Sequence, residues 1–146
     1  MPVIDKSGDW WKGDSLTDLS EFVVEFTSRN YQADDIRPSR CVSCGGTTFE
    51  LLVDDDEGCA RRVCCECNVG AFLADSEDYW DDAGPGAAEC SCGASSFELV
   101  SGFSLLETGE VRWVTIGARC PGCGILGVYA EWKIDYEPSR QLLEKI

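Results

Sequence analysis

The sequence predicts a small metal-bound β protein with two tandem, three-stranded antiparallel units, an N-terminal amphipathic helix and a short C-terminal helix. Three observations support this fold class: one cysteine-bearing segment occurs twice, each copy ends in a second cysteine pair, and the 146-residue chain contains no histidine. A close internal repeat indicates two copies of one supersecondary unit. Without histidine, a tetrahedral metal site must consist of thiolates, alone or with carboxylates.

The repeat runs from Cys41 to Glu131. The first copy opens with CVSCGGTTFEL at 41–51 and the second with CSCGASSFEL at 90–99, and each closes on a further cysteine pair, at 64–67 and 120–123. We therefore expect five parts along the chain: a helix and connector at 1–40, the first unit at 41–75, an acidic linker at 76–89, the second unit at 90–134 and a tail helix at 135–146.

The N-terminal helix is predicted over residues 15–30. Asp14 or Ser15 can cap it, Asp18 suits a capping-box-like turn, and apolar residues recur at helical spacing. We expect its apolar face and the two tryptophans at 10–11 to pack on the first unit. The alternative is that this face docks another chain.

The rest of the chain is predicted to be mostly extended. Residues 31–40 form an extended connector because a residue before proline, here Arg37, disfavours helix. The tail at 138–146 has apolar residues at helical spacing and a proline that a first helical turn allows. β-branched and aromatic residues bounded by turn residues predict strands at 47–53, 59–63 and 69–74 in the first unit, and at 96–106, 111–119 and 125–134 in the second.

The ten cysteines are interpreted as metal ligands. Residues 1–13 lack the pattern of a signal peptide and no stretch is apolar enough to cross a bilayer, so we expect a cytoplasmic protein whose thiols stay reduced. A Cys-x-x-Cys turn brings two sulfurs to one ion, and the backbone after its second cysteine favours glycine or asparagine. Those residues are Gly45, Asn68, Gly93 and Gly124.

Two structural Zn²⁺ sites are therefore predicted, one in each unit. A unit of about 40 residues buries too little apolar surface to fold without such support. Cys65 is an alternative ligand to Cys64, and Cys59 is expected to be a small buried strand residue. The assigned ligands are Cys41, Cys44, Cys64 and Cys67 in the first site, and Cys90, Cys92, Cys120 and Cys123 in the second.

Residues 41–75 and 90–134 resemble the zinc-ribbon class, and Cys120-Pro-Gly-Cys123-Gly is similar to its rubredoxin-type knuckle. The resemblance implies a three-stranded antiparallel ribbon with structural zinc, and it fixes no function. Rubredoxins tend to be acidic, so an iron electron carrier is one alternative. The short Cys90-Ser-Cys92 turn departs from their double Cys-x-x-Cys pattern.

Charge and ligand type favour a binding protein over an enzyme. Four-thiolate zinc sites are closed, and the chain lacks histidine as a general base. The formal charge is −15, and residues 41–89 hold twelve acidic against two basic residues. We expect an adaptor or inhibitor, immunity-protein-like or a regulatory subunit, that binds a basic protein. The predicted contact residues are Asp54, Asp55, Asp56, Glu57, Asp78, Tyr79, Trp80 and Asp81.

Nucleic-acid binding through the second unit is the alternative function. Cations there lie near large aromatic side chains, which could stack on single-stranded bases. The overall negative charge opposes this by repelling phosphates. The residues concerned are Arg112, Arg119, Lys133, Trp113 and Trp132.

Overall fold

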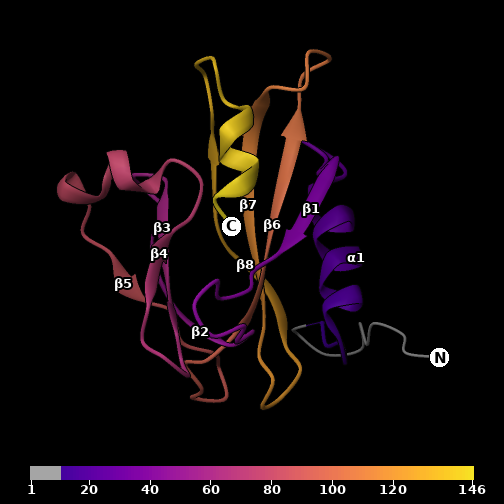
Figure 1. Cartoon of the computed structure of the whole chain (residues 1–146). Helices are drawn as coiled ribbons and strands as arrows, with labels where there is room; N and C mark the ends of the chain where they lie inside the picture. The colour runs from indigo at the N-terminus through magenta and orange to yellow at the C-terminus, as the bar shows by residue number, and fades with distance from the viewer. Residues whose placement is uncertain (1–10) are drawn as a thin grey trace.

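The computed structural model describes residues 11–146 and contains two four-stranded antiparallel sheets and one α-helix (Figure 1). The first sheet has the order β4-β3-β2-β5 and the second has the order β1-β6-β7-β8. The strands of the first sheet are β2 Phe49–Asp54, β3 Cys59–Cys64, β4 Gly70–Phe72 and β5 Gly86–Ala87. Those of the second are β1 Asp35–Pro38, β6 Glu98–Leu105, β7 Val111–Arg119 and β8 Leu126–Lys133.

Each sheet contains one strand more than the sequence predicted. The connector supplies β1, which pairs with β6 from Asp35 opposite Phe103 to Pro38 opposite Val100. The linker supplies β5, which pairs with β2 through Ala87 opposite Leu52. Both extra strands lie at sheet edges, where short or proline-containing strands are tolerated, and they are too short for an alternating pattern to show.

The helix α1, Leu16–Thr27, packs on the second sheet, so the predicted packing on the first unit is wrong. In Figure 1, α1 and the first sheet lie on opposite sides of the second sheet. The Ser15 side chain caps the helix by accepting a hydrogen bond from the Asp18 N–H. Glycines in the second sheet allow the helix to pack closely: a Cβ on Gly117 would lie 2.5 Å from a Val23 methyl group and would clash with it.

The same helix also contacts the chain just before it. Trp11 meets Phe22 edge to face, with ring centroids 5.5 Å apart. Trp10, which was predicted to join this packing, lies outside the described residues. No helix within residues 11–146 is long and apolar enough to cross a bilayer.

The two units share one core. Phe49 and Phe97 occupy equivalent places in the repeat and are both fully buried. Each donates its backbone N–H to the other's carbonyl at 2.8 Å, so the repeats meet through a reciprocal antiparallel bridge. The core cluster continues on both sides, with Leu51 and Leu73 from the first unit and Leu99 from the second. The sequence had left open whether the units pack together.

The linker and the tail both contain short 3-10 turns. The linker contains two 3-10 turns, η1 Ser76–Asp78 and η2 Trp80–Asp82. The tail was predicted to form a short helix over 135–146, and it instead contains one 3-10 turn, η3 Arg140–Glu144. Hydrogen bonds hold this tail to both units, from Ala74 N to Lys145 O at 2.8 Å and from Ser139 N to the Glu110 carboxylate at 2.6 Å.

Candidate metal centres

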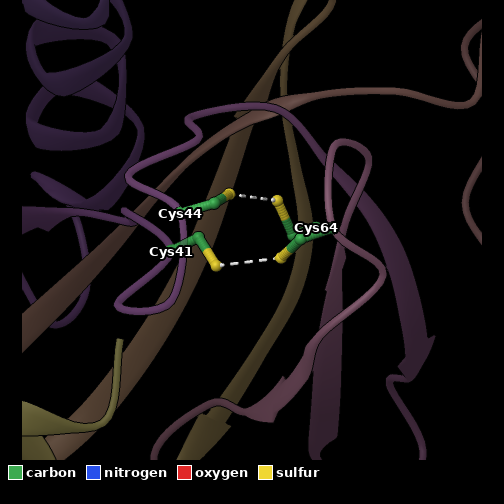
Figure 2. A group of neighbouring side chains, drawn as sticks. Cys41, Cys44 and Cys64 are labelled. Carbon is green, nitrogen blue, oxygen red and sulfur yellow. Dashed lines mark hydrogen bonds between the residues drawn. The ribbon is translucent and has the colours of Figure 1, made fainter.

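Eight of the ten thiols form two groups whose sulfurs all lie within 4.8 Å of one another. In Figure 2, Cys41 and Cys44 from the turn before β2 and Cys64 from the end of β3 point toward one another. The closest sulfur pairs are 3.5 Å apart in the first group and 3.5 and 3.7 Å apart in the second. The groups are Cys41, Cys44, Cys64 and Cys67, and Cys90, Cys92, Cys120 and Cys123.

These distances suit a shared ion. A disulfide would bring two sulfurs to about 2.05 Å, whereas a tetrahedron of thiolates about 2.3 Å from an ion has edges of roughly 3.8 Å. All ten cysteines lie in the described part of the chain, and none forms a disulfide. Each group therefore has the ligand number and spacing to hold one metal ion, and an all-sulfur ligand set makes zinc plausible.

The backbone of each cysteine pair has the geometry that the sequence predicted. The residues that follow the second cysteine all have positive φ, with values of 78° at Gly45, 63° at Asn68, 92° at Gly93 and 81° at Gly124. Three of these are glycines, which adopt such angles without steric cost. The short pair at Cys90 closes like the others, because its N–H also bonds to the carbonyl two residues past the second cysteine.

Backbone N–H groups inside the turns favour the thiolate form of some ligands. The N–H of Cys44 lowers the pKa of Cys41 to about 6, and that of Ala94 lowers the pKa of Cys92 to about 7. The pKa of Cys64 is also lowered, chiefly by the N–H of Cys67. The pKa values of Cys44, Cys67, Cys90 and Cys123 are instead raised, so the turns favour the thiolate, which is the form that ligates metal, at two sulfurs of the first group and one of the second.

The two remaining cysteines lie outside both groups. The first group contains Cys64, while the exposed Cys65 places its sulfur 3.5 Å from the Ser96 hydroxyl. Cys59 is fully buried in β3, as predicted, and burial raises the pKa of its thiol.

A buried arginine beside the first group was missed by the sequence analysis. Arg62 is only 4% exposed, and it donates hydrogen bonds to the backbone oxygens of Arg40 at 3.3 Å and Ile146 at 3.0 Å. Burial lowers the pKa of its guanidinium, and the sulfurs of Cys41 and Cys64 act in the opposite direction. The available signal was its place two residues before Cys64, on the same face of a strand.

The structure joins the two acidic segments that were predicted to bind a partner. The Asp54 carboxylate accepts hydrogen bonds from the backbone of Asp56 and Glu57 in the hairpin tip and from Gly84 in the linker, at 2.8–3.1 Å. The Gly84 bond is the main reason that the pKa of Asp54 is lowered. Asp54 therefore organises the loop, and we call the tip 54–57 together with the turns 77–82 the acidic edge.

The other predicted contact residues of the acidic edge are mostly exposed. Asp56, Glu57, Asp78 and Asp81 face solvent, whereas the exposed Asp55 accepts a bond from the Glu131 N–H at 3.1 Å. Of the two aromatic residues, Tyr79 is 41% exposed. Trp80 is half-buried and lies edge-on to Phe72, with ring centroids 5.4 Å apart.

The cations considered for nucleic-acid binding are largely engaged within the protein. Arg119 forms an ion pair with Glu98 and donates to the Gly13 carbonyl at 2.7 Å. Trp113 stacks on Tyr31 with ring centroids 4.7 Å apart, and the Arg112 guanidinium lies 5.2 Å from the same Tyr31 ring. Trp132 is buried, whereas Lys133 is exposed and Arg112 and Trp113 stay partly exposed, so part of the predicted basic and aromatic set remains at the surface.

An apolar groove of about 670 Å³ borders the second cysteine group, and the sequence analysis did not predict it. It lies between α1 and β8, with Phe22 and Phe26 on one side and Val128 and Tyr129 on the other. The available signal was the spacing of the two phenylalanines, which places both on one helical face.

A scan against protein-family models, a search of curated proteins and a search of solved structures each find no match to this chain. The likeness to zinc ribbons therefore rests on the cysteine pairs and on the geometry of the two sulfur groups.

Proposed function

We propose that this chain is a non-enzymatic, cytoplasmic, tandem zinc-ribbon protein that binds a basic protein partner through the acidic edge. The observation that carries the proposal is the bond between Asp54 and Gly84, which holds two exposed acidic segments on one surface. A protein with such a surface would act as an adaptor, or as an inhibitor of the immunity-protein kind. The two sulfur groups would hold zinc as structural ions that fix the β units behind it.

The charge of the molecule supports a basic partner. The chain carries −15 before metal binding, and a zinc ion with four thiolates contributes about −2, so two loaded sites would give about −19. A surface of one sign speeds the encounter with a partner of opposite sign. Tyr79 can supply the apolar contact that such an interface needs at its centre.

The absence of catalytic groups supports a binding role. With four sulfurs each, the proposed zinc sites leave no coordination position for substrate or water. The chain contains no histidine, and within residues 11–146 no ion pair joins a cation to the carboxylates of the acidic edge and tunes them for acid–base work.

Affinity capture with a charge-reversed variant tests the partner. We expect the wild-type protein to retain a basic protein whose binding weakens as salt rises, because the Debye length shortens. Asp56→Lys with Glu57→Lys should abolish capture. The matched control is Glu21→Lys with Glu107→Lys, which changes the net charge equally at exposed positions outside the acidic edge. Capture of RNA or DNA, or equal loss in both variants, would refute the proposal.

Metal analysis tests the zinc sites separately. We expect native mass spectrometry to find two zinc ions per chain, and removal of both to unfold the protein, since structural zinc contributes on the order of 10 kcal/mol. A red protein with visible absorption would instead indicate iron and the rubredoxin-like alternative. A folded, metal-free chain with cystines would exclude both.

A further inference from the structure

The two sulfur groups share one pattern of exposure but differ in the charges around them. In each, the first and third cysteines are buried, the second is exposed and the fourth is half-buried. Beside the first group lies the buried Arg62. The equivalent place in the second unit, two residues before Cys120, is taken by the fully buried Ala118.

We propose that Arg62 is a charge-compensating residue for the first metal site, and that the second site, which lacks such a cation, releases its metal first. The inference rests on the proposed zinc sites. A zinc ion with four thiolates is a dianion, and a buried cation near it is screened far less by water than a surface charge.

The contacts of Arg62 fix its charge close to the site. Its guanidinium lies 4.6 Å from the centre of the Phe49 ring and donates to the carbonyl of Arg40, the residue directly before Cys41. It forms no ion pair with an Asp or Glu side chain of residues 11–146. Besides the Ile146 backbone oxygen, which a free C-terminus would make a carboxylate, the thiolates of Cys41 and Cys64 are the nearby anions that the Arg62 charge can compensate.

The other charged groups near the first site are exposed and of opposite sign. The Glu66 carboxylate lies 3.9 Å from the Cys44 sulfur, and Arg40 lies over the turn at Gly45. Both side chains face solvent, which screens them. They also oppose each other, so Arg62 is the cation that distinguishes the first site.

The second site has neutral neighbours where the first has Arg62. Burial, and after it the four nearby sulfurs, raise the pKa of the Tyr129 phenol to about 12, so this side chain is uncharged at neutral pH. Arg119 precedes Cys120 but is held by Glu98 and the Gly13 carbonyl. The Arg119 side chain is only 13% exposed but its charge is paired with Glu98, so the dianion of a loaded second site would lack an unpaired buried counter-charge.

The experiment follows zinc loss from the intact two-zinc protein under excess chelator. Samples are alkylated at intervals, and peptide mapping shows which cysteine group has become reactive. In the wild type, we expect the second group to react first. Arg62→Met keeps the apolar stem over Phe49 and removes the charge, and it should speed release from the first site by roughly 10- to 100-fold, the usual effect of losing a group that supports metal ligands.

Two further variants separate charge from folding. Arg61→Met alters the neighbouring residue of β3, whose guanidinium lies 5.5 Å from the Phe72 ring, and should leave both release rates unchanged. Arg62→Lys keeps the charge and should release more slowly than Arg62→Met. If Arg62→Met does not fold, the comparison is made between Arg62→Lys and a polar, uncharged Arg62→Gln variant. Slower metal release from the first site in Arg62→Lys would support the role of the charge, and equal release would refute it.

Three results would overturn the inference. They are equal release from both sites in the wild type, earlier release from the first site, and the same rates in Arg62→Met and Arg61→Met. A wild-type protein that never holds two zinc ions would instead overturn the proposed zinc sites, which native mass spectrometry shows before any chelator is added.

Discussion

Replacing Phe97 by alanine tests whether the two repeats unfold as one unit. The side chain is fully buried, joins the core cluster that both units share, and packs against Tyr129 with ring centroids 5.1 Å apart. A buried Phe→Ala change costs about 3–5 kcal/mol, and the lost ring pair is worth about 0.5–1.5 kcal/mol. The backbone bonds to Phe49 remain, so we expect the free energy of unfolding to fall by about 4 kcal/mol. This is a large part of the roughly 5–15 kcal/mol that stabilises a domain.

Urea unfolding of the zinc-loaded protein measures this loss. Tryptophan fluorescence follows both units, and alkylation of Cys41 and Cys64 follows the first unit alone. Both probes should shift to the same lower midpoint in the variant. Phe26→Ala, at a ring that is 49% exposed, should change stability by less than about 1 kcal/mol. If Phe97→Ala shifts the fluorescence and leaves alkylation of the first unit unchanged, the shared core does not couple the repeats.

Three further substitutions test single contacts. Asp75→Asn should lower the free energy of unfolding in urea by about 1–3 kcal/mol. The buried carboxylate accepts hydrogen bonds from Trp132 Nε1 at 3.0 Å and from the Tyr136 hydroxyl at 2.8 Å, and an amide would replace one acceptor by a donor. An unchanged stability would contradict this. The pKa of Glu110 is lowered, chiefly by the Ser139 N–H, so its contribution is complete above pH 4.5 and disappears as the pH falls through the lowered value. Glu110→Gln should therefore lower Tm at pH 7 and converge with the wild type in acid, whereas a constant gap would be inconsistent. Ser15→Ala should cost about 1 kcal/mol through the lost helix cap, and an unchanged Tm would show that the cap is dispensable.

The cysteine geometry was predictable from sequence because it is local. The spacing of each pair and the residue after it determine a turn, and all four turns have the expected positive φ. The hairpin strands were also close to prediction, with β7 at Val111–Arg119 matching the predicted 111–119. These features depend on residues near one another in the chain.

The features that sequence reasoning missed depend on tertiary contacts. The apolar face of α1 indicated that the helix is buried on one side, but it could not identify which sheet the helix packs on. Gly102 and Gly117 of the second sheet leave the room for Val23 that determines this packing. The two-residue β5 exists because its backbone completes the edge of β2. The burial of Arg62 depends on the backbone oxygens of Arg40 and Ile146, which are distant in the sequence, so its place two residues before Cys64 could not reveal these partners.

The shared core also determines how metal loss and unfolding would be related. The buried ligands Cys41, Cys64, Cys90 and Cys120 belong to the same core cluster, so full release from either site disturbs packing in both units. The exposed ligands Cys44 and Cys92 can meet a chelator without unfolding, because opening of one turn costs less than opening of the core. Attack should therefore begin at an exposed sulfur, where local charge sets the rate, and finish only when the core opens. Adding urea below the unfolding midpoint should consequently speed the last step more than the first.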